Sequence, residues 1–120
     1  MKILVVDDSK AMRAVVVRAL SRVPQVAGAT IVEAVDGREG FMAVETESPD
    51  LVLSDWNMPV MTGIELLRAL NEAGLTPTFG FVTSEATPEM RELASAHGAT
   101  FLVAKPVTPE SLGAALAGVL

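Results

Sequence analysis

Short apolar runs alternate along the chain with segments in which apolar residues recur at helical spacing. The runs are rich in β-branched residues and end abruptly in polar ones, which is typical of strands buried on both faces. We expect strands near residues 2–6, 28–34, 50–54, 77–82 and 100–104, and helices near residues 9–22, 37–47, 63–73, 88–97 and 108–119. Regular alternation of strand and helix predicts an α/β fold, with a parallel sheet between two layers of helices.

Three of the expected helices begin with recognisable caps. Thr62 is followed three residues later by Glu65, the spacing of a capping box, and Gly74 ends that helix. Thr87 and Thr108 each place a hydroxyl immediately before a proline, which suits the N-cap and first helical positions. The stripe of the first helix that we expect to face the sheet comprises Met12, Val15, Val16, Ala19 and Leu20.

Chemically active side chains follow four of the five strands. Asp7 and Asp8 end the first strand, Asp55 the third, Thr83 the fourth and Lys105 the fifth. The carboxyl ends of parallel strands lie at one edge of the sheet, where such folds bind their ligands. A single aspartate after a strand is usually a turn or cap residue, and a single lysine usually pairs with a surface acid. Four coordinated strand ends favour a functional site.

Three carboxylates brought to one place need a compensating cation, because like charges at close range repel. Oxygen ligands of this kind suit Mg²⁺, which commonly bridges a protein to phosphate. A carboxylate can itself be a nucleophile and form an acyl phosphate. With an ammonium and a hydroxyl beside it, the cluster predicts a metal-assisted site for a phosphoryl group on an aspartate.

Composition narrows the setting of this site. A chain of 120 residues, half of them hydrophobic, predicts a single folded domain over residues 1–120. The net charge of −6 argues against nucleic acid as a direct partner. The absence of cysteine excludes disulfides and fits a cytoplasmic protein. The N-terminal apolar stretch is too short for a signal peptide or a membrane span, so we expect no membrane association.

Several short motifs, in order and over nearly the whole chain, resemble the receiver domains of two-component response regulators, and most of all the CheY-like type. They are Val5-Val6-Asp7-Asp8-Ser9, Asp55-Trp56-Asn57-Met58-Pro59, Gly63-Ile64-Glu65-Leu66-Leu67, Val82-Thr83-Ser84-Glu85 and Lys105-Pro106. The resemblance implies a (βα)5, doubly wound, flavodoxin/CheY-like fold with strand order 2-1-3-4-5.

The same resemblance implies a role for each acidic residue. Asp55 would be the phosphoacceptor. Asp8 and Asp55 would bind Mg²⁺ directly together with the backbone carbonyl of Asn57, and Asp7 would act through water.

Further roles follow from the resemblance for the residues around the acceptor. Thr83 would bind a phosphoryl oxygen, Lys105 would pair first with Asp55 and then with the phosphate, and the Lys105–Pro106 peptide would be cis. Asn57 and Glu85 occupy the two positions that govern hydrolysis of the acyl phosphate in the family, and their identities predict a short-lived signal.

One position departs from the family pattern. Three residues before Lys105 the family has a tyrosine or phenylalanine that swings inward on activation, whereas this chain has Leu102. Phe101 is adjacent, but successive residues of a strand point to opposite faces, so Phe101 does not replace the missing ring.

The resemblance implies a stand-alone signalling module and not a turnover enzyme. It would take its phosphoryl group from a sensor histidine kinase, a phosphotransfer protein or a small phosphodonor, and would dephosphorylate itself. It would bind a target protein through the face formed by the fourth helix, fifth strand and fifth helix.

Four alternatives to a stand-alone receiver remain at this point. They are a receiver excised from a larger regulator, a pseudo-receiver with altered switching at Leu102, a haloacid-dehalogenase-like phosphatase, and a flavodoxin-like cofactor protein. Asn57 stands where such a phosphatase has a second acid, and Asp7 and Asp8 would repel a bound phosphate cofactor.

Overall fold

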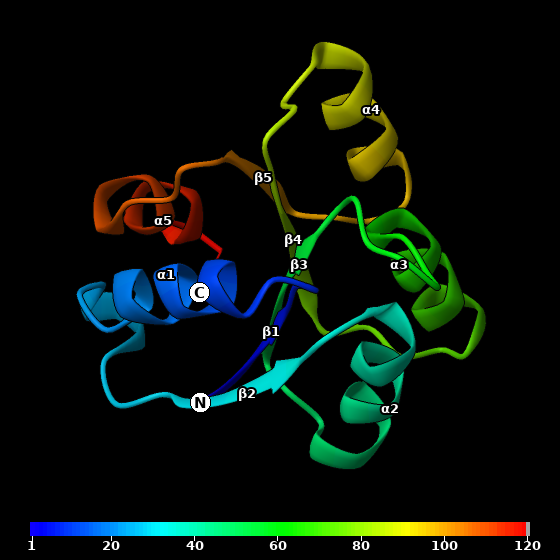
Figure 1. Cartoon of the computed structure of the whole chain (residues 1–120), viewed down its shortest axis with the longest axis horizontal. Coiled ribbons are helices and arrows are strands. Elements are labelled where there is room, and N and C mark those ends of the chain that lie inside the picture. Colours follow the sequence, from blue (N-terminus) through cyan, green and yellow to red (C-terminus); the bar gives the residue numbers. More distant parts are fainter. Residues whose placement is uncertain (120) are drawn as a thin grey trace.

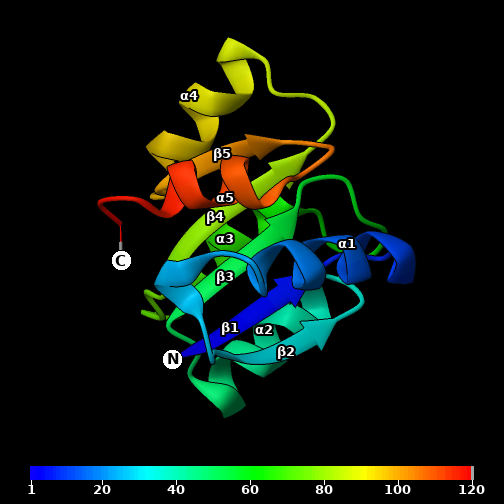
Figure 2. The same cartoon turned by 90° about the vertical axis from the view of Figure 1, so that its left-hand side faces the viewer.

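The computed structural model describes residues 1–119, in which five parallel strands form one sheet between two layers of helices (Figure 1). The strands are β1 (Lys2–Val6), β2 (Thr30–Ala34), β3 (Leu51–Asp55), β4 (Thr78–Thr83) and β5 (Phe101–Ala104). They are arranged in the order β2-β1-β3-β4-β5, which confirms the expected fold class and strand order. All five point the same way, so their carboxyl ends share one edge of the sheet (Figure 2).

Five helices cover the sheet, two on one face and three on the other. The helices are α1 (Lys10–Leu20), α2 (Gly37–Glu47), α3 (Gly63–Glu72), α4 (Pro88–Ala96) and α5 (Pro109–Leu116), and a 3-10 turn, η1, spans Pro24–Val26. Helices α1 and α5 lie side by side on one face, and α2, α3 and α4 lie on the opposite face (Figures 1 and 2). Among residues 1–119, none of these helices combines the length and the apolar character that crossing a bilayer requires.

The hydrophobic core has two layers, one on each face of the sheet, so the central strands are buried on both faces. Ile3 and Val5 of β1 pack into the cluster under α1 and α5, while Leu4 and Val6 pack into the cluster under α2, α3 and α4. All four are at most 1% exposed. This explains why the strands appear in the sequence as continuous apolar runs and not as alternating ones.

The expected helix starts are confirmed. Thr62 and Glu65 form a reciprocal capping box at α3, and the hydroxyls of Thr87 and Thr108 accept the capping hydrogen bonds of α4 and α5. Asp36 caps α2 in the same way by accepting from the backbone N–H of Glu39. Each cap satisfies a backbone donor that has no partner within its own helix.

Two details of the expected helices are wrong. The last helix ends at Leu116 and does not continue to about residue 119, because Ala117 is extended and Gly118 has a φ of +81°. In α1, Val15 is 41% exposed, whereas Arg13 is buried in phase with Val16 and Leu20. The buried stripe of α1 is therefore rotated relative to the one expected from apolar residues alone.

At the edge of the sheet, the fit between β4 and β5 depends on a glycine. Gly80 is in register with Phe101, and a Cβ atom on Gly80 would overlap the Phe101 ring. The ring of Phe101 therefore occupies the space that any other residue at position 80 would need for its side chain.

We expect Gly80→Ala to lower the free energy of unfolding by about 2 kcal/mol, as overpacking of a filled site commonly does. In a Phe101→Val background, which removes the ring, the same substitution should cost less than half as much. Urea denaturation of the four proteins measures both costs. An equal cost in the two backgrounds would show that the ring is not the obstacle.

Candidate functional site

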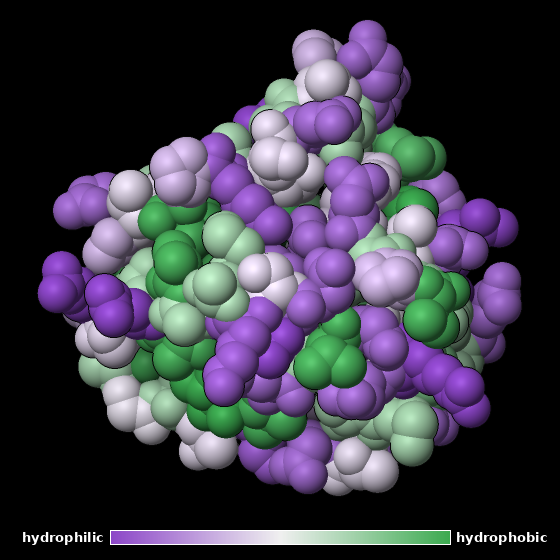
Figure 3. Space-filling model, in the orientation of Figure 1, coloured by the Kyte–Doolittle hydropathy of each residue, from purple (hydrophilic) through white to green (hydrophobic). Residues whose placement is uncertain are grey.

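An acidic cluster occupies the carboxyl edge of the sheet. Asp7 follows β1, Asp8 is next in the chain, and Asp55 is the last residue of the neighbouring strand β3. One carboxylate oxygen from each lies within 4.8 Å of the other two. Asp7 and Asp55 are buried, at 3% and 8% exposure, while Asp8 is exposed. Figure 3 shows the face toward which the strands point, with hydrophilic residues gathered near its centre.

Lys105 brings a positive charge into this cluster from β5. Its Nζ lies 3.2 Å from Oδ2 of Asp7 and 3.3 Å from Oδ1 of Asp55, so it bridges the two buried carboxylates. The backbone N–H of Lys105 donates to the carbonyl of Thr83 at 2.8 Å, which fixes the start of the loop that carries the ammonium. The Lys105–Pro106 peptide is cis, as the resemblance implied.

Backbone donors orient the two buried carboxylates. Oδ1 of Asp7 accepts from the N–H of Ser9 at 2.9 Å, and Oδ1 of Asp55 accepts from the N–H of Trp56 at 2.8 Å. Hydrogen bonds from backbone donors stabilise the charged form of a carboxylate and restrict its rotation. The two carboxylates thus present defined oxygens toward the same space.

The surroundings of Asp55 raise its pKa above the ordinary value of 3.8. Burial away from water is the main cause, and the negative charge of Asp7 adds to it. The positive charge of Lys105 and the hydrogen bond from Trp56 act in the opposite direction without cancelling the effect. Asp55 is therefore a carboxylate whose negative charge is costly in the folded protein, which favours binding of a cation or reaction with an electrophile.

Thr83 is the last residue of β4, beside β3, and its side chain is fully buried. Its hydroxyl oxygen accepts from the N–H of Glu85 at 3.2 Å. That bond fixes the oxygen but leaves the hydroxyl proton available for donation. The structure thus places a potential donor at the strand end next to Asp55, although Thr83 is not one of the side chains that bond to the cluster itself.

The donor set of the cluster fits the expected metal. Asp7, Asp8 and Asp55 supply oxygen ligands alone, and hard cations such as Mg²⁺ prefer oxygen. Asn57 lies two residues after Asp55 in the loop that follows β3, and its side chain is exposed. These residues are compatible with an Mg²⁺ ion held by one or two carboxylates and water.

Arg13 is part of this site although its role is not evident from the sequence motifs. It is buried, its Nη1 donates to the backbone carbonyl of Asp7 at 2.6 Å, and its Nε donates to Oε1 of Glu33 at 2.9 Å. The signal that could have revealed it is its position three residues before Val16, which places it on the buried stripe of α1.

Leu102 stands where the family has an aromatic ring, and Phe101 is its neighbour in β5. The two side chains lie on opposite faces of the sheet, as strand alternation predicts. Leu102 is 8% exposed and packs into the cluster that contains Trp56 and Phe81, with Phe81 as its register partner on β4. Phe101 packs against the other cluster, on the side of α1 and α5. The register from Phe101 to Ala104 is continuous, so no bulge moves the aromatic ring into the position of Leu102.

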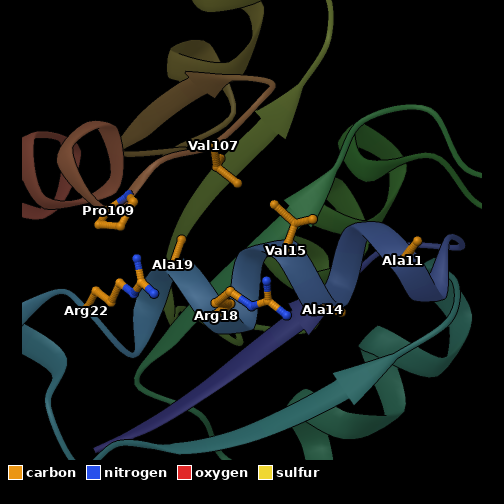
Figure 4. A pocket seen from close by; sticks show the side chains of 8 residues that line it. All are labelled: Ala11, Ala14, Val15, Arg18, Ala19, Arg22, Val107 and Pro109. Carbon is orange, nitrogen blue, oxygen red and sulfur yellow. The ribbon is translucent and has the colours of Figure 1, made fainter.

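A groove with a volume of about 410 Å³ lies away from the acidic cluster, between α1 and the segment leading into α5 (Figure 4). Its lining consists of apolar side chains and two guanidinium groups, from Ala11, Ala14, Val15, Arg18, Ala19, Arg22, Val107 and Pro109. It carries no carboxylate to bind a metal or accept a phosphoryl group. The carboxylates that could hold a cation thus lie in the acidic cluster and not in this groove.

Asp55→Asn is expected to raise the free energy of unfolding in metal-free buffer near neutral pH by on the order of 1 kcal/mol. The raised pKa means that ionised Asp55 is less favourable in the folded chain than in the unfolded chain. The stability of the wild type should therefore fall as the pH rises from 3.8 through the raised pKa, a loss that the asparagine variant does not share. Urea titrations near pH 4 and at neutral pH measure the difference, and an equal advantage at both would contradict this account.

Comparison with known proteins agrees with this geometry. Residues 3–117 match the model of the response regulator receiver domain. A probable chemotaxis protein CheY from Rhizobium etli is 36% identical over 98% of this chain and 91% of its own length. The solved structure of the chemotaxis response regulator CheY4 of Vibrio cholerae is 37% identical over 99% of this chain and 98% of that one, with a TM-score of 0.85.

Another relative is much longer than this chain. A protein-glutamate methylesterase/protein-glutamine glutaminase of Koribacter versatilis is 38% identical over 92% of this chain, and the match spans only 30% of that protein. The sequence match, the strand order and the acidic edge of the sheet thus agree, and the chain belongs to the response regulator receiver family as a CheY-like receiver domain.

Proposed function

We propose that this receiver takes a phosphoryl group onto Asp55 in an Mg²⁺-dependent reaction and loses it again by hydrolysis. The donor is the phosphohistidine of a sensor histidine kinase or phosphotransfer protein, or a small phosphodonor. The observation that carries the proposal is the cluster of Asp7, Asp8 and Asp55 within 4.8 Å, bridged by Lys105 at the carboxyl edge of the sheet. Since the chain acts on its own aspartate, we regard it as a self-modifying receiver and not as a turnover enzyme.

In the transfer step, a carboxylate oxygen of Asp55 attacks phosphorus, a new P–O bond forms and the bond from phosphorus to the donor breaks. Lys105 lies 3.3 Å from the Asp55 carboxylate and can follow the negative charge onto the phosphoryl oxygens. Thr83 can donate its free hydroxyl proton to another of these oxygens. Phosphoryl transfer needs mainly positioning and charge neutralisation, and these side chains supply both.

The expected ligands of the metal are Asp8, Asp55 and the backbone carbonyl of Asn57, with Asp7 acting through water. When bound, Mg²⁺ would neutralise charge shared between the carboxylates and the phosphoryl oxygens. Asp7 is already engaged by Ser9 and Lys105, whereas Asp8 is exposed and open to direct ligation. This difference supports the division of roles between the two neighbouring aspartates.

We propose that the output is phosphorylation-dependent binding of a target protein through the face formed by α4, β5 and α5. The relatives from Rhizobium etli and Vibrio cholerae are chemotaxis proteins that this chain covers to 91% and 98% of their length, which supports a stand-alone receiver. The match to 30% of a methylesterase supports the alternative, a receiver module of a larger regulator. Leu102, buried where the family has a mobile ring, supports altered switching at that face.

The binding and transfer steps can be followed with Trp56, which directly follows Asp55 and whose ring centroid lies 4.6 Å from that of Phe81. We expect its fluorescence to change on addition of Mg²⁺ and again, reversibly, on addition of acetyl phosphate. Asp55→Asn should lose the second change, while Asp36→Asn, which keeps the cap of α2, should retain it. Intact mass should show one added phosphoryl group in the wild type, and its absence with every donor would refute the proposal.

We expect the phosphorylated state to last from seconds to minutes because Asn57 and Glu85, both exposed beside the site, leave access for an attacking water. The decay of the added mass after removal of the donor measures the lifetime. Replacing both residues with larger side chains should slow the decay by about tenfold, a change of about 1.4 kcal/mol in activation free energy. A wild-type phosphoprotein that persists for many hours would contradict this prediction.

A further inference from the structure

Arg13 connects three elements at the acidic edge. Its guanidinium donates to the backbone carbonyl of Asp7 through Nη1 and to the carboxylate of Glu33, on β2, through Nε. The ion pair with Glu33 is at 2.9 Å, and the arginine side chain is 11% exposed. An arginine at the start of α1 is thus turned inward, toward the end of β1, and not toward solvent.

We propose that Arg13 is a positioning residue for metal binding: it fixes the Asp7–Asp8 peptide and thereby the direction in which the Asp8 carboxylate is presented. The inference rests on the proposed function, because it concerns the same Mg²⁺ site. It adds a residue that lies outside the acidic cluster and acts through the backbone of Asp7.

Every polar group of Asp7 is engaged. Its N–H donates to the carbonyl of Ala34 at 3.1 Å, its Oδ1 accepts from Ser9, and its Oδ2 accepts from Lys105. Its carbonyl is bound by Arg13 through a buried hydrogen bond. This last bond orients the peptide plane between Asp7 and Asp8, since a carbonyl and the following N–H lie in one plane.

Asp8 lies in different surroundings from Asp7. Its side chain is exposed, so packing of neighbouring side chains does little to fix it, and its reach toward Asp55 depends on the backbone that carries it. A rotation of the Asp7–Asp8 peptide would swing the Asp8 carboxylate relative to that of Asp55, whereas the present orientation keeps oxygens of the three aspartates within 4.8 Å. Residues that orient metal ligands through hydrogen bonds commonly change metal affinity by about 10- to 100-fold when they are replaced.

The chemistry of arginine suits both of these contacts, with Asp7 and with Glu33. Its planar fork can serve the carbonyl of Asp7 and the carboxylate of Glu33 at the same time in one fixed geometry. A lysine has a single flexible ammonium and cannot reproduce both bonds in that geometry. Glu33 is in register with Val5 on β1, so the fork is tied to the sheet itself.

The test measures the Kd of Mg²⁺ by Trp56 fluorescence and the unfolding midpoint in metal-free buffer for four proteins. Arg13→Met should weaken Mg²⁺ binding about tenfold, and Arg13→Lys should fall between it and the wild type. Glu33→Gln is the matched control: it keeps an oxygen to accept from Nε while removing a nearby charge. Its Kd should stay within about twofold of the wild type, because the bond to Asp7 is retained.

The sign of the effect separates positioning from electrostatics. Removing a cation close to the acidic cluster would by itself strengthen Mg²⁺ binding, whereas loss of positioning weakens it. A folded Arg13→Met protein with an unchanged or stronger affinity would overturn the inference, even if its midpoint fell. If that variant does not fold, Arg13→Lys decides: weakening of several-fold supports the inference, and a Kd within twofold of the wild type overturns it.

The same measurements separate this inference from the proposed function. A wild type that binds Mg²⁺ and takes up a phosphoryl group, beside a folded Arg13→Met protein of equal affinity, would leave the function standing and remove the role of Arg13. A wild type with no response to Mg²⁺ would overturn both.

Discussion

The carboxylates of Asp7 and Asp55 repel each other at a partly buried edge of the sheet, and Lys105 is the cation that holds them together. The repulsion and the burial raise the pKa of Asp55, and the ammonium opposes both. The position of the Lys105 ammonium depends on the whole sheet. Strands β1 and β3 are neighbours, whereas β5, which Lys105 directly follows, lies two strands beyond β3. The strand order, the buried strands and the loop that carries Lys105 together allow three separate parts of the chain to share one small volume.

The charge balance of this edge supports the phosphoryl chemistry that we propose for it. Three carboxylates face one ammonium, so the site carries an excess of negative charge before any phosphate arrives. A divalent cation relieves this excess, and a phosphoryl group then brings oxygens that the same cation and Lys105 can share. Under the proposed function, the cation and the phosphoryl group would thus be held by charges that are poorly compensated in the free protein.

Leu102 departs from the family pattern, and this bears on how phosphorylation of Asp55 would affect other parts of the protein. Leu102 is already buried against Phe81 and the apolar cluster below Asp55, so it has no exposed position from which to swing inward. Phe101 is committed to the opposite cluster by its fit against Gly80. A signal from the proposed acceptor to α4 and β5 would therefore have no swinging ring at position 102 to carry it.

Features that depend on local chemistry could be predicted from the sequence: the five buried strands, the helix caps at Thr62, Thr87 and Thr108, and the polar residues at the strand ends. These follow from patterns within a few residues. The burial of Arg13 and the exposure of Val15 could not be predicted in this way, because the rotation of α1 is set in the tertiary structure by what the helix packs against. The pairing of Lys105 with Asp7 as well as Asp55 is likewise set by the tertiary structure, since that pairing depends on distances between strands far apart in the chain.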